Sequence, residues 1–279
     1  MNSAGNEGCG PDERPDDARA RSSAAVIGTP RVGQVNADEA YVGLTLEPGT
    51  TRPHVALGMV AAADGASAID GASGQLGGSG DFSAFRRLRD AADVILVGAR
   101  TVIAEDYRPP VPDASRQADR VARGLAAVPR LAILTRSVGI DPSARVFSDP
   151  AHLPIVLVTG SVSARAHGDI APVAEVVELK GDHVTIETAL DALWHRGLRR
   201  LLCEGGPTVN NLLLCEDLID EMFITVTPLA VGGPAPRIIA GPHPSPARPF
   251  DCSSVTVVGN EVLLRYRRNR LVDGHGSDQ

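Results

Sequence analysis

The amino-acid sequence predicts an α/β fold with a mostly parallel central sheet, flanked by helices and closed by a C-terminal antiparallel hairpin. Two observations support this fold class. Short, continuous apolar runs alternate along the chain with segments whose apolar residues recur at helical spacing, which is typical of parallel strands covered by helices on both faces. Near the end of the chain, two apolar runs flank Gly259-Asn260, a pair that favours a hairpin turn.

The predicted strands are apolar runs bounded by turn residues. They cover 54–63, 93–98, 130–135, 154–159, 174–178, 200–203, 220–227, 254–258 and 262–268. The predicted helices show apolar residues along one side, and the first of them has Asp81 near its start. They cover 81–90, a segment that begins near Ala99, 185–196 and 208–215.

Composition divides the chain into four parts. Residues 1–24 are rich in Gly, Asp, Arg, Ser and Pro, so they bury too little apolar surface to offset their ordering entropy and are predicted to be disordered. Residues 25–51 form an N-terminal extension, 52–268 a single α/β domain, and 269–279 a flexible C-terminal tail.

Charge and cysteine content exclude several classes of function. The formal net charge is −7, with 34 acidic and 27 basic residues, so we expect no partner among nucleic acids or anionic membranes. The four cysteines are scattered without a C-x-x-C pair, and the seven histidines do not cluster, so we expect neither a disulfide framework nor a metal site. The sequence has no long apolar run and no apolar signal-peptide core, which predicts a soluble, cytoplasmic protein.

Candidate binding residues follow the strands, because ligands of open parallel sheets bind beyond the carboxyl ends of the strands. After strand 200–203 come Gly205, Gly206, Pro207 and Thr208, two glycines followed by a proline suited to a first helical turn. The amino end of that helix is predicted to hold a diphosphate through its free N–H groups. A plain strand-to-helix turn would show the same residues, so this alternative stays open.

Two further strand ends carry residues suited to the same ligand. Thr135, Arg136 and Ser137 supply two hydroxyls and a guanidinium that could select the 2′-phosphate of an NADP-type cofactor. Gly98 permits close approach of the backbone and Thr101 offers a hydroxyl, although a helix start needs such residues for its own caps.

Two carboxylates are candidates for proton transfer. Glu204 stands at the end of strand 200–203, directly before the glycines, and Asp64 follows three alanines, 61–63, that leave room for a flat ring. A turn carboxylate exposed to solvent is the alternative for each.

These segments, taken in order, resemble one family. Asp64-Gly65, Gly71-Ala-Ser73, Leu88-Arg89-x-x-Ala92-Asp93-Val-Ile-Leu-Val-Gly98-x-x-Thr101-Val102, Glu204-Gly-Gly-Pro-Thr208 and Leu218-Ile-Asp220-Glu221 are similar to the riboflavin-biosynthesis pyrimidine reductases, which are relatives of dihydrofolate reductase. The resemblance covers about residues 52–268 and implies a dihydrofolate-reductase-like fold and a homodimer. It also implies NADPH-dependent reduction of the ribosyl group of an aminouracil ribose phosphate, as in 5-amino-6-(5-phosphoribosylamino)uracil reductase.

The resemblance also implies roles for individual residues. Those expected to hold NADPH are Ala61, Thr101, Glu105, Thr135 and the segment 206–212, which includes Val209. Ser73, Arg89 and Glu204 are expected to contact the small-molecule substrate, with Arg89 reaching its phosphate.

Two features depart from the family pattern. The zinc deaminase signature, H-x-E with P-C-x-x-C, is absent. Where the family has an acid-acid-Pro-x-Leu-x-x-Arg stretch, this chain has residues 105–112, so the second phosphate-binding arginine is displaced, and Arg108 or Arg116 is its candidate replacement. This departure keeps two alternatives open: a dihydrofolate-reductase-like or specialised-metabolite reductase, and an NADPH-binding protein without catalysis.

Overall fold

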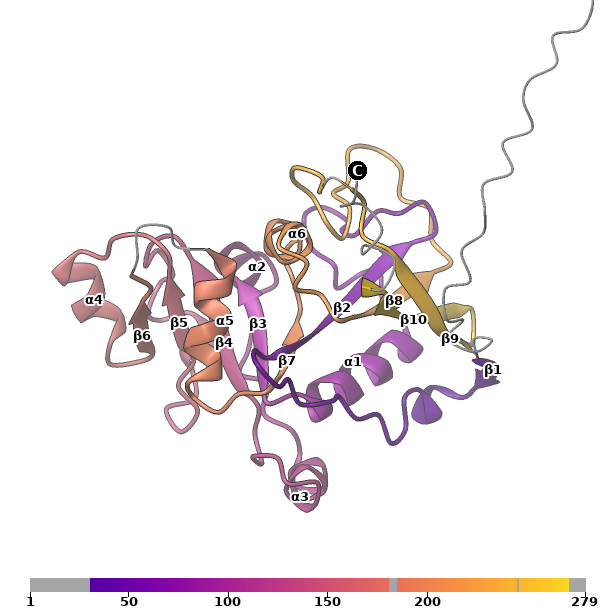
Figure 1. The fold of residues 1–279 in the computed structure, drawn as a ribbon, viewed down its shortest axis with the longest axis horizontal. Helices are drawn as coiled ribbons and strands as arrows, with labels where there is room; N and C mark the ends of the chain where they lie inside the picture. Colours follow the sequence, from indigo (N-terminus) through magenta and orange to yellow (C-terminus); the bar gives the residue numbers. More distant parts are fainter. Residues whose placement is uncertain (1–30, 181–184, 245, 271–279) are drawn as a thin grey trace, which may run out of the picture.

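A ten-stranded sheet forms the centre of the protein (Figure 1). The structure is a computed structural model that describes residues 31–180, 185–244 and 246–270. The strands are β1 (Arg31–Val35), β2 (His54–Ala62), β3 (Val94–Gly98), β4 (Arg130–Thr135), β5 (Ile155–Val158), β6 (Glu175–Glu178), β7 (Arg200–Cys203), β8 (Glu221–Thr227), β9 (Phe250–Val258) and β10 (Glu261–Arg268). They lie in the order β1-β9-β10-β8-β2-β7-β3-β4-β5-β6.

Six α-helices and two short 3-10 helices connect the described strands. The α-helices are α1 (Ser79–Ala91), α2 (Ala99–Ala104), α3 (Ala114–Ala122), α4 (Ala164–Ile170), α5 (Ile186–Trp194) and α6 (Pro207–Cys215). The 3-10 helices are η1 (Ala37–Glu39) and η2 (Arg145–Phe147).

The predicted α/β fold is confirmed, and so is the C-terminal hairpin. Only β10, among the described strands, runs against its neighbours; it pairs antiparallel with β8 and β9, whereas the other neighbouring pairs are parallel. Gly259 takes a positive φ of 58° in the turn between β9 and β10, a conformation that glycine adopts without steric cost. Because β2, β7, β3 and β4 are parallel neighbours, their carboxyl ends line one edge of the sheet.

Alternation of side chains along the strands builds one apolar core on each face of the sheet. On one face, Leu88 of α1, Val102 of α2 and Ile170 of α4 pack against strand residues such as Ile95 and Ile133. On the other face, α5 and α6 cover the central strands. Their buried residues there are Ile186, Ala189, Leu190, Leu193, Val209 and Leu213.

The segment 31–51, which the sequence places outside the main domain, belongs to the same sheet. β1 pairs in parallel with β9. Leu44 and Leu46 are buried in the core beneath α1, and Tyr41 packs edge-on against Phe223 with ring centroids 5.4 Å apart. This segment therefore completes the α1 face of the sheet.

A buried arginine fastens α3 to the carboxyl end of α1. Arg120 is fully buried and donates hydrogen bonds of 2.9–3.0 Å to the carbonyl oxygens of Arg89, Asp90, Ala92 and Ala126. A helix leaves its last carbonyl groups without partners in the helix, so these bonds satisfy them. They fix the last turn of α1, which carries Arg89.

Four elements differ from those predicted. The sequence did not predict β1, α3 or α4, and β9 begins at Phe250 rather than near residue 254. Both missed α-helices are short and polar and begin with a capping side chain, Asp113 for α3 and Ser163 for α4. The predicted N-terminal tail and most of the C-terminal tail lie outside the described residues.

Two kinds of feature are absent from the described residues. No helix there is both long and apolar enough to cross a membrane. In the same part of the chain, no group of three or more His, Cys, Asp or Glu residues has the geometry to hold a metal ion.

Candidate active site

Two of the predicted segments meet where β3 and β7 end. The N–H of Gly98 donates to the carbonyl oxygen of Gly205 at 2.8 Å. A Cβ atom on Gly98 would lie 3.0 Å from Cγ2 of Val209, and one on Gly206 would lie 2.6 Å from Oγ1 of Thr101. The backbone at both glycines therefore packs closely against the Val209 and Thr101 side chains. The peptide bond between Gly205 and Gly206 is cis.

The amino end of α6 opens onto this junction. Its N-cap is Gly206, which has no capping side chain, and Pro207 occupies the first turn. Arg100 lies beside this helix end and donates to Oγ1 of Thr208 at 2.9 Å. Uncapped N–H groups, the positive end of the helix dipole and a guanidinium together favour an anion.

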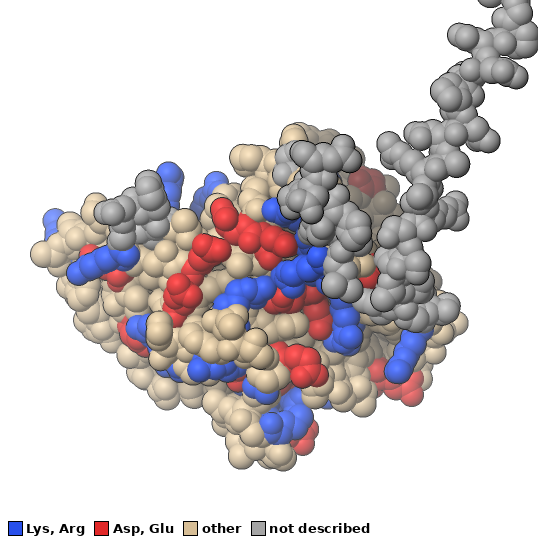
Figure 2. Space-filling model, viewed as in Figure 1, with Lys and Arg blue, Asp and Glu red and all other residues tan. Residues whose placement is uncertain are grey.

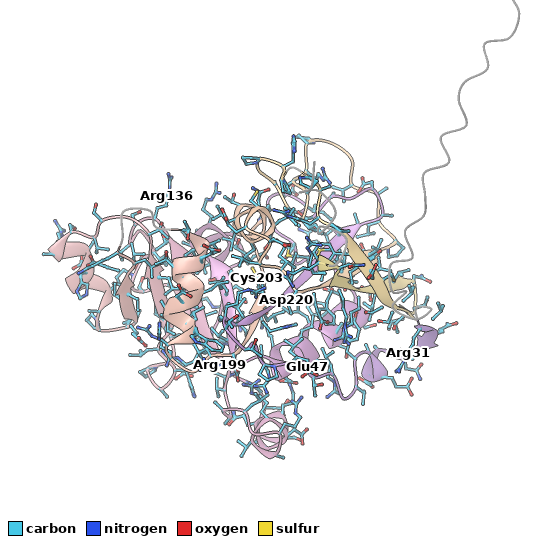
Figure 3. All side chains as sticks on the ribbon, in the orientation of Figure 1. Arg31, Glu47, Arg136, Arg199, Cys203 and Asp220 are labelled. Carbon is cyan, nitrogen blue, oxygen red and sulfur yellow. The ribbon has the colours of Figure 1, made fainter. Side chains whose placement is uncertain are left out.

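The segment after β4 lies further along the same edge. Thr135 donates through Oγ1 to the carbonyl oxygen of Ser137 at 2.6 Å and accepts a hydrogen bond from the N–H of Ser137 at 3.3 Å. Between them, Arg136 is exposed and projects from the rim of the molecule (Figure 3). The Thr135 hydroxyl thus holds the turn, and the guanidinium of Arg136 reaches into solvent.

Asp64 holds a loop together. Its carboxylate accepts hydrogen bonds from the N–H groups of Gly232 at 2.7 Å, Val231 at 2.8 Å and Ala66 at 3.3 Å. These bonds, with that from Gly232 the strongest, lower the pKa of Asp64 below its usual value. A lowered pKa disfavours proton donation near neutral pH, and the predicted catalytic role of Asp64 stays a prediction.

Ser73 and Glu105 connect the predicted substrate and cofactor sides. The N–H of Ser73 donates to Oε1 of Glu105 at 2.7 Å, so the residue that follows α2 holds the loop between β2 and α1. Ala61 is buried near the end of β2, and its carbonyl oxygen accepts from Oγ1 of Thr227 at 3.5 Å. Both contacts hold the loop near the carboxyl end of β2.

Arg89, Glu204 and Tyr107 form a tight cluster. Nε and NH2 of Arg89 donate to Oε1 and Oε2 of Glu204 at 2.7 and 2.8 Å, a bidentate pair. The Tyr107 hydroxyl accepts from NH2 of Arg89 at 2.8 Å and donates to Oε2 of Glu204. The guanidinium also lies 4.6 Å from the ring centroid of Phe85. The side chain of Glu204 is only 1% exposed, compared with 25% for Arg89.

The cluster shifts the pKa values of two of its members. Burial and then the facing carboxylate of Glu204 raise the pKa of Tyr107 well above its usual value, so the phenol stays protonated. Burial alone would lower the pKa of Arg89, but the opposing effects of Glu204 and Tyr107 outweigh it and raise that pKa. The ground state of the cluster is therefore a neutral phenol bonded to a guanidinium–carboxylate pair.

Sequence reasoning missed two functional candidates. Tyr107 lies in the stretch 105–112 that departs from the family pattern, and that departure was the signal that could have singled it out. Arg100 follows Gly98 by two positions, but nothing in the sequence pairs it with Thr208. Arg116, a candidate second phosphate ligand, is instead bound to Asp90 by bonds of 2.7 and 2.8 Å, whereas Arg108 is exposed.

Known proteins share both sequence and fold with this chain. The model of a family described as the RibD C-terminal domain matches residues 53–264. The 2,5-diamino-6-ribosylamino-4(3H)-pyrimidinone 5′-phosphate reductase of Archaeoglobus fulgidus is 31% identical over 183 residues, which are 65% of this chain and 83% of that protein. The protein of the same name from Methanothermobacter thermautotrophicus is also 31% identical over 183 residues, 65% of this chain and 81% of that protein.

The fold comparison agrees with the sequence comparison. A pyrimidine reductase-like protein from Corynebacterium diphtheriae superimposes with a TM-score of 0.73 at 24% identity, over 85% of this chain and all of that one. RibD of Acinetobacter baumannii gives a TM-score of 0.64 at 23% identity, over 79% of this chain and 59% of that one. On the extent of the family match, which includes β2 to β9 and the first half of β10, this chain belongs to the family described as the RibD C-terminal domain.

Proposed function

We propose that this protein is an NADPH-dependent reductase of a pyrimidine- or pteridine-like small molecule, with a ribosylaminopyrimidine as the first substrate class to test. One observation carries the proposal: the amino end of α6 has no capping side chain and lies beside the guanidinium of Arg100, so its N–H groups and that charge can receive a diphosphate. The names of the two archaeal relatives support a reductase acting on a ribosylaminopyrimidine phosphate.

The residues present fit a dinucleotide. The diphosphate would lie at the amino end of α6 beside Arg100, and a 2′-phosphate would lie near Arg136. Bound NADPH would supply the hydride, while the chain supplies position and charge. Ser73 and Arg89 would face the substrate, and Glu204 would act through Arg89, because its own side chain is almost completely buried.

Isothermal titration with NADPH and NADH tests the cofactor. Arg100→Ala should weaken NADPH binding by about tenfold, the effect of losing one charge-assisted hydrogen bond or ion pair. Arg136→Ala should reduce the preference for NADPH over NADH while changing NADH binding little. Gly168→Ala is a matched control, because a Cβ at this position in α4 meets nothing within 4 Å. Absence of NADPH binding to the unmodified protein would refute the proposal.

Oxidation of NADPH in the presence of the ribosylaminopyrimidine, with and without its 5′-phosphate, tests the reaction. Substrate-dependent loss of the nicotinamide absorbance would support the reductase. Tyr107 lies in the stretch that departs from the family pattern and contacts Arg89, which favours a second candidate, a reductase of an unphosphorylated pteridine such as dihydrofolate. NADPH binding without turnover of any of these compounds would instead indicate a binding protein.

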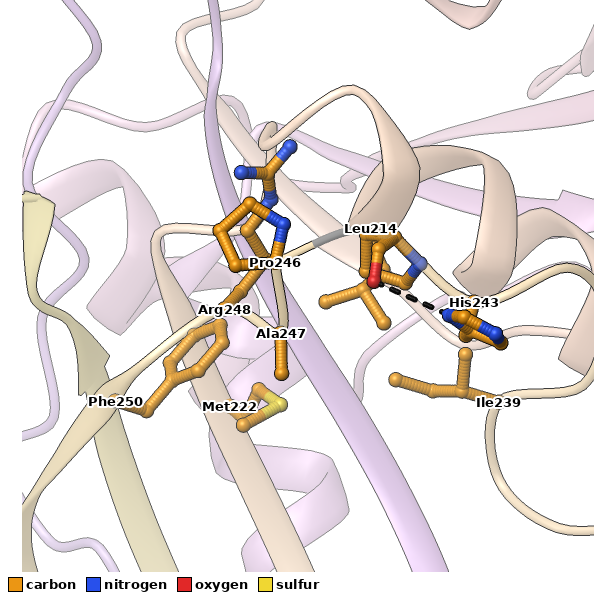
Figure 4. Close-up of a pocket in the computed structure, with 9 residues that line it drawn as sticks. Leu214, Met222, Ile239, His243, Pro246, Ala247, Arg248 and Phe250 are labelled. Carbon is orange, nitrogen blue, oxygen red and sulfur yellow. Dashed lines mark hydrogen bonds between the residues drawn. The ribbon is translucent and has the colours of Figure 1, made fainter. Parts of the chain in front are cut away.

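We also propose that the protein is a homodimer, as the family resemblance implies. On the sheet face opposite α1, apolar side chains of three adjacent strands are half-buried: Ile224 and Val226 on β8, Val262 and Leu264 on β10, and Val255 and Val257 on β9. A hollow of about 660 Å³ adjoins this face at Met222 and continues to Leu214 and Phe250 (Figure 4). Contiguous apolar surface of this kind marks an interface.

The oligomeric state in solution tests this part of the proposal. Sedimentation at micromolar concentration should give twice the monomer mass, and Leu264→Glu should give the monomer mass because it places a charge on the apolar face. Val121→Glu on α3 is the control, since Val121 is an exposed apolar residue away from that face and its replacement should leave the dimer intact. A monomeric unmodified protein would contradict the homodimer.

A further inference from the structure

We propose that Tyr107 is a specificity-determining residue, and that with Glu204 it makes Arg89 a hydrogen-bond donor to an uncharged acceptor of the substrate instead of a phosphate-binding residue. The inference rests on the proposed function and goes beyond it by naming the chemistry that this part of the site selects. It concerns the stretch 105–112, where the chain departs from the pattern of the family it resembles.

The first argument comes from the donors of Arg89. A guanidinium has five N–H donors. In the described residues, Nε and NH2 of Arg89 bond to Glu204, and NH2 also bonds to the Tyr107 hydroxyl. NH1 makes no hydrogen bond to any of those residues, and the Arg89 side chain is a quarter exposed. Only NH1 therefore remains to bind a ligand. An unpaired arginine binds a phosphate through two of its nitrogens in a bidentate arrangement, which NH1 alone cannot form.

The second argument comes from charge. Both carboxylate oxygens of Glu204 lie within 2.8 Å of guanidinium nitrogens, so the pair carries no net charge. A phosphate placed at NH1 would be attracted by Arg89 and repelled by the buried carboxylate behind it, where water screens little. A carbonyl or hydroxyl oxygen would accept the same hydrogen bond without that repulsion. The arrangement therefore favours an uncharged acceptor.

The third argument concerns the neighbouring arginines. Arg116 pairs with both carboxylate oxygens of Asp90 on α1, and Arg120 is fully buried among backbone carbonyl groups. Neither guanidinium is available to complete a clamp with Arg89. A phosphate at this position would thus lack a second strong partner from α3.

The fourth argument is that Tyr107 is held in place by its backbone and its ring. Its N–H donates to the carbonyl oxygen of Val102 at 3.0 Å, and Asp106 before it has a positive φ of 44°. The ring packs against the core beneath α1, with its centroid 5.5 Å from the guanidinium carbon of Arg89. The hydroxyl is thereby held against Arg89 and Glu204, and a ligand that needed both donors of NH2 would have to displace it.

The experiment compares the ribosylaminopyrimidine with and without its 5′-phosphate, by NADPH oxidation and by isothermal titration in the presence of NADP⁺, which cannot reduce the compound. For the unmodified protein, the ratio of kcat/KM values for the two compounds should lie within about threefold of unity. Tyr107→Phe keeps the ring but frees a donor of NH2, and should shift both the kcat/KM ratio and the Kd ratio toward the phosphorylated compound by about tenfold. Tyr266→Phe removes a hydroxyl from β10 and should leave both ratios unchanged.

Two results would overturn the inference. One is a preference of the unmodified protein for the phosphorylated compound by more than about a hundredfold, which corresponds to a strong charged contact. The other is a Tyr107→Phe variant that folds, by its urea unfolding midpoint, with ratios equal to those of the unmodified protein. If neither compound is turned over, the Kd ratios decide the inference while the reductase proposal alone fails; if neither binds, both fail. Competition by inorganic phosphate against the unphosphorylated compound needs no variant: weak competition supports the inference, and strong competition contradicts it.

Discussion

Glu204→Gln should destabilise the folded protein strongly even in the absence of any ligand. The substitution keeps the size and one acceptor oxygen of the side chain but removes the charge that faces Arg89. Two charge-assisted bonds of 2.7 and 2.8 Å and the bond from Tyr107 then lose their ionised acceptor. Glutamine also places an N–H₂ group where Glu204 accepted a hydrogen bond.

The structure sets the magnitude of this loss. Removing one partner of a buried ion pair costs about 3–5 kcal/mol, because the other charge stays buried without compensation. Since a quarter of the Arg89 side chain is exposed and remains hydrated, we expect a value near the lower end, about 3 kcal/mol. The measurement is equilibrium unfolding in urea at pH 7 and 25 °C, read as the change in the free energy of unfolding.

A second glutamate provides a matched control. Glu175 also pairs with two arginines, Arg130 and Arg196, at 2.8 Å, but its side chain is 39% exposed. Glu175→Gln should therefore cost less than about 1 kcal/mol, as exposed ion pairs do. A Glu204→Gln loss that is no larger than that of Glu175→Gln would refute the reasoning, because it would show that burial of the pair does not determine its contribution.

Three further predictions follow from the packing. Arg120→Met should cost about 3–5 kcal/mol of unfolding free energy in urea, since the carbonyl groups of Arg89, Asp90, Ala92 and Ala126 lose this donor, although that of Asp90 keeps the bond from Arg123. A loss under about 1 kcal/mol would show that water replaces the guanidinium. Gly80→Ala should cost about 1–3 kcal/mol by the same measurement, because its Cβ would lie 2.8 Å from Cβ of Val258. Gly168→Ala is the control and should be neutral or stabilising, since its Cβ meets nothing within 4 Å. Equal effects of the two substitutions would contradict the crowding at Gly80. Burial, with repulsion from Glu261, raises the pKa of Asp81, so the folded state binds this proton more tightly than the unfolded state and loses stability as pH rises through the folded pKa. Asp81→Asn should accordingly increase stability at pH 7 relative to the unmodified protein and show a smaller gain below the unfolded pKa of about 4, and a gain independent of pH would argue against this assignment.

Charged side chains of both signs share the face of the molecule that Figure 2 shows. In the view of Figure 2, basic and acidic side chains are interspersed across the face, without an extended region of one sign. Two of the described ion-pair groups lie around Asp220 and Glu221, which bind Arg52 and Arg265 respectively. Basic residues that could meet an anion, such as Arg100 and Arg136, are instead placed locally at the carboxyl edge of the sheet.

Most of the sheet and the glycine turns at its carboxyl edge could be predicted from the sequence. β3, β4, β5 and β7 are apolar runs whose covering helices carry apolar residues at helical spacing, and both patterns are local. The glycines at 98 and 206 mark close approach of the backbone, because a Cβ at these positions would crowd the side chains of Val209 and Thr101. Local patterns of this kind leave a direct trace in the sequence.

The remaining features could not be predicted from the sequence, because they depend on partners that are distant along the chain. β1 exists through parallel pairing with β9, more than two hundred residues later, and its own burial pattern is almost wholly exposed. α3 is short and polar, and Arg120 holds it by bonds to α1. A prediction that uses only neighbouring residues takes account of neither β9 nor α1.

The sequence by itself determined the order of most strands and helices and the two glycine turns at the carboxyl edge of the sheet. It did so because apolar periodicity and backbone conformation act over a few residues. Only the tertiary structure decided that Arg89 meets Glu204, 115 positions later, under the hydroxyl of Tyr107. Packing between elements decides which side chains meet. Arg89, which the sequence predicts to bind a phosphate, is therefore bound to the carboxylate of Glu204 in the folded protein.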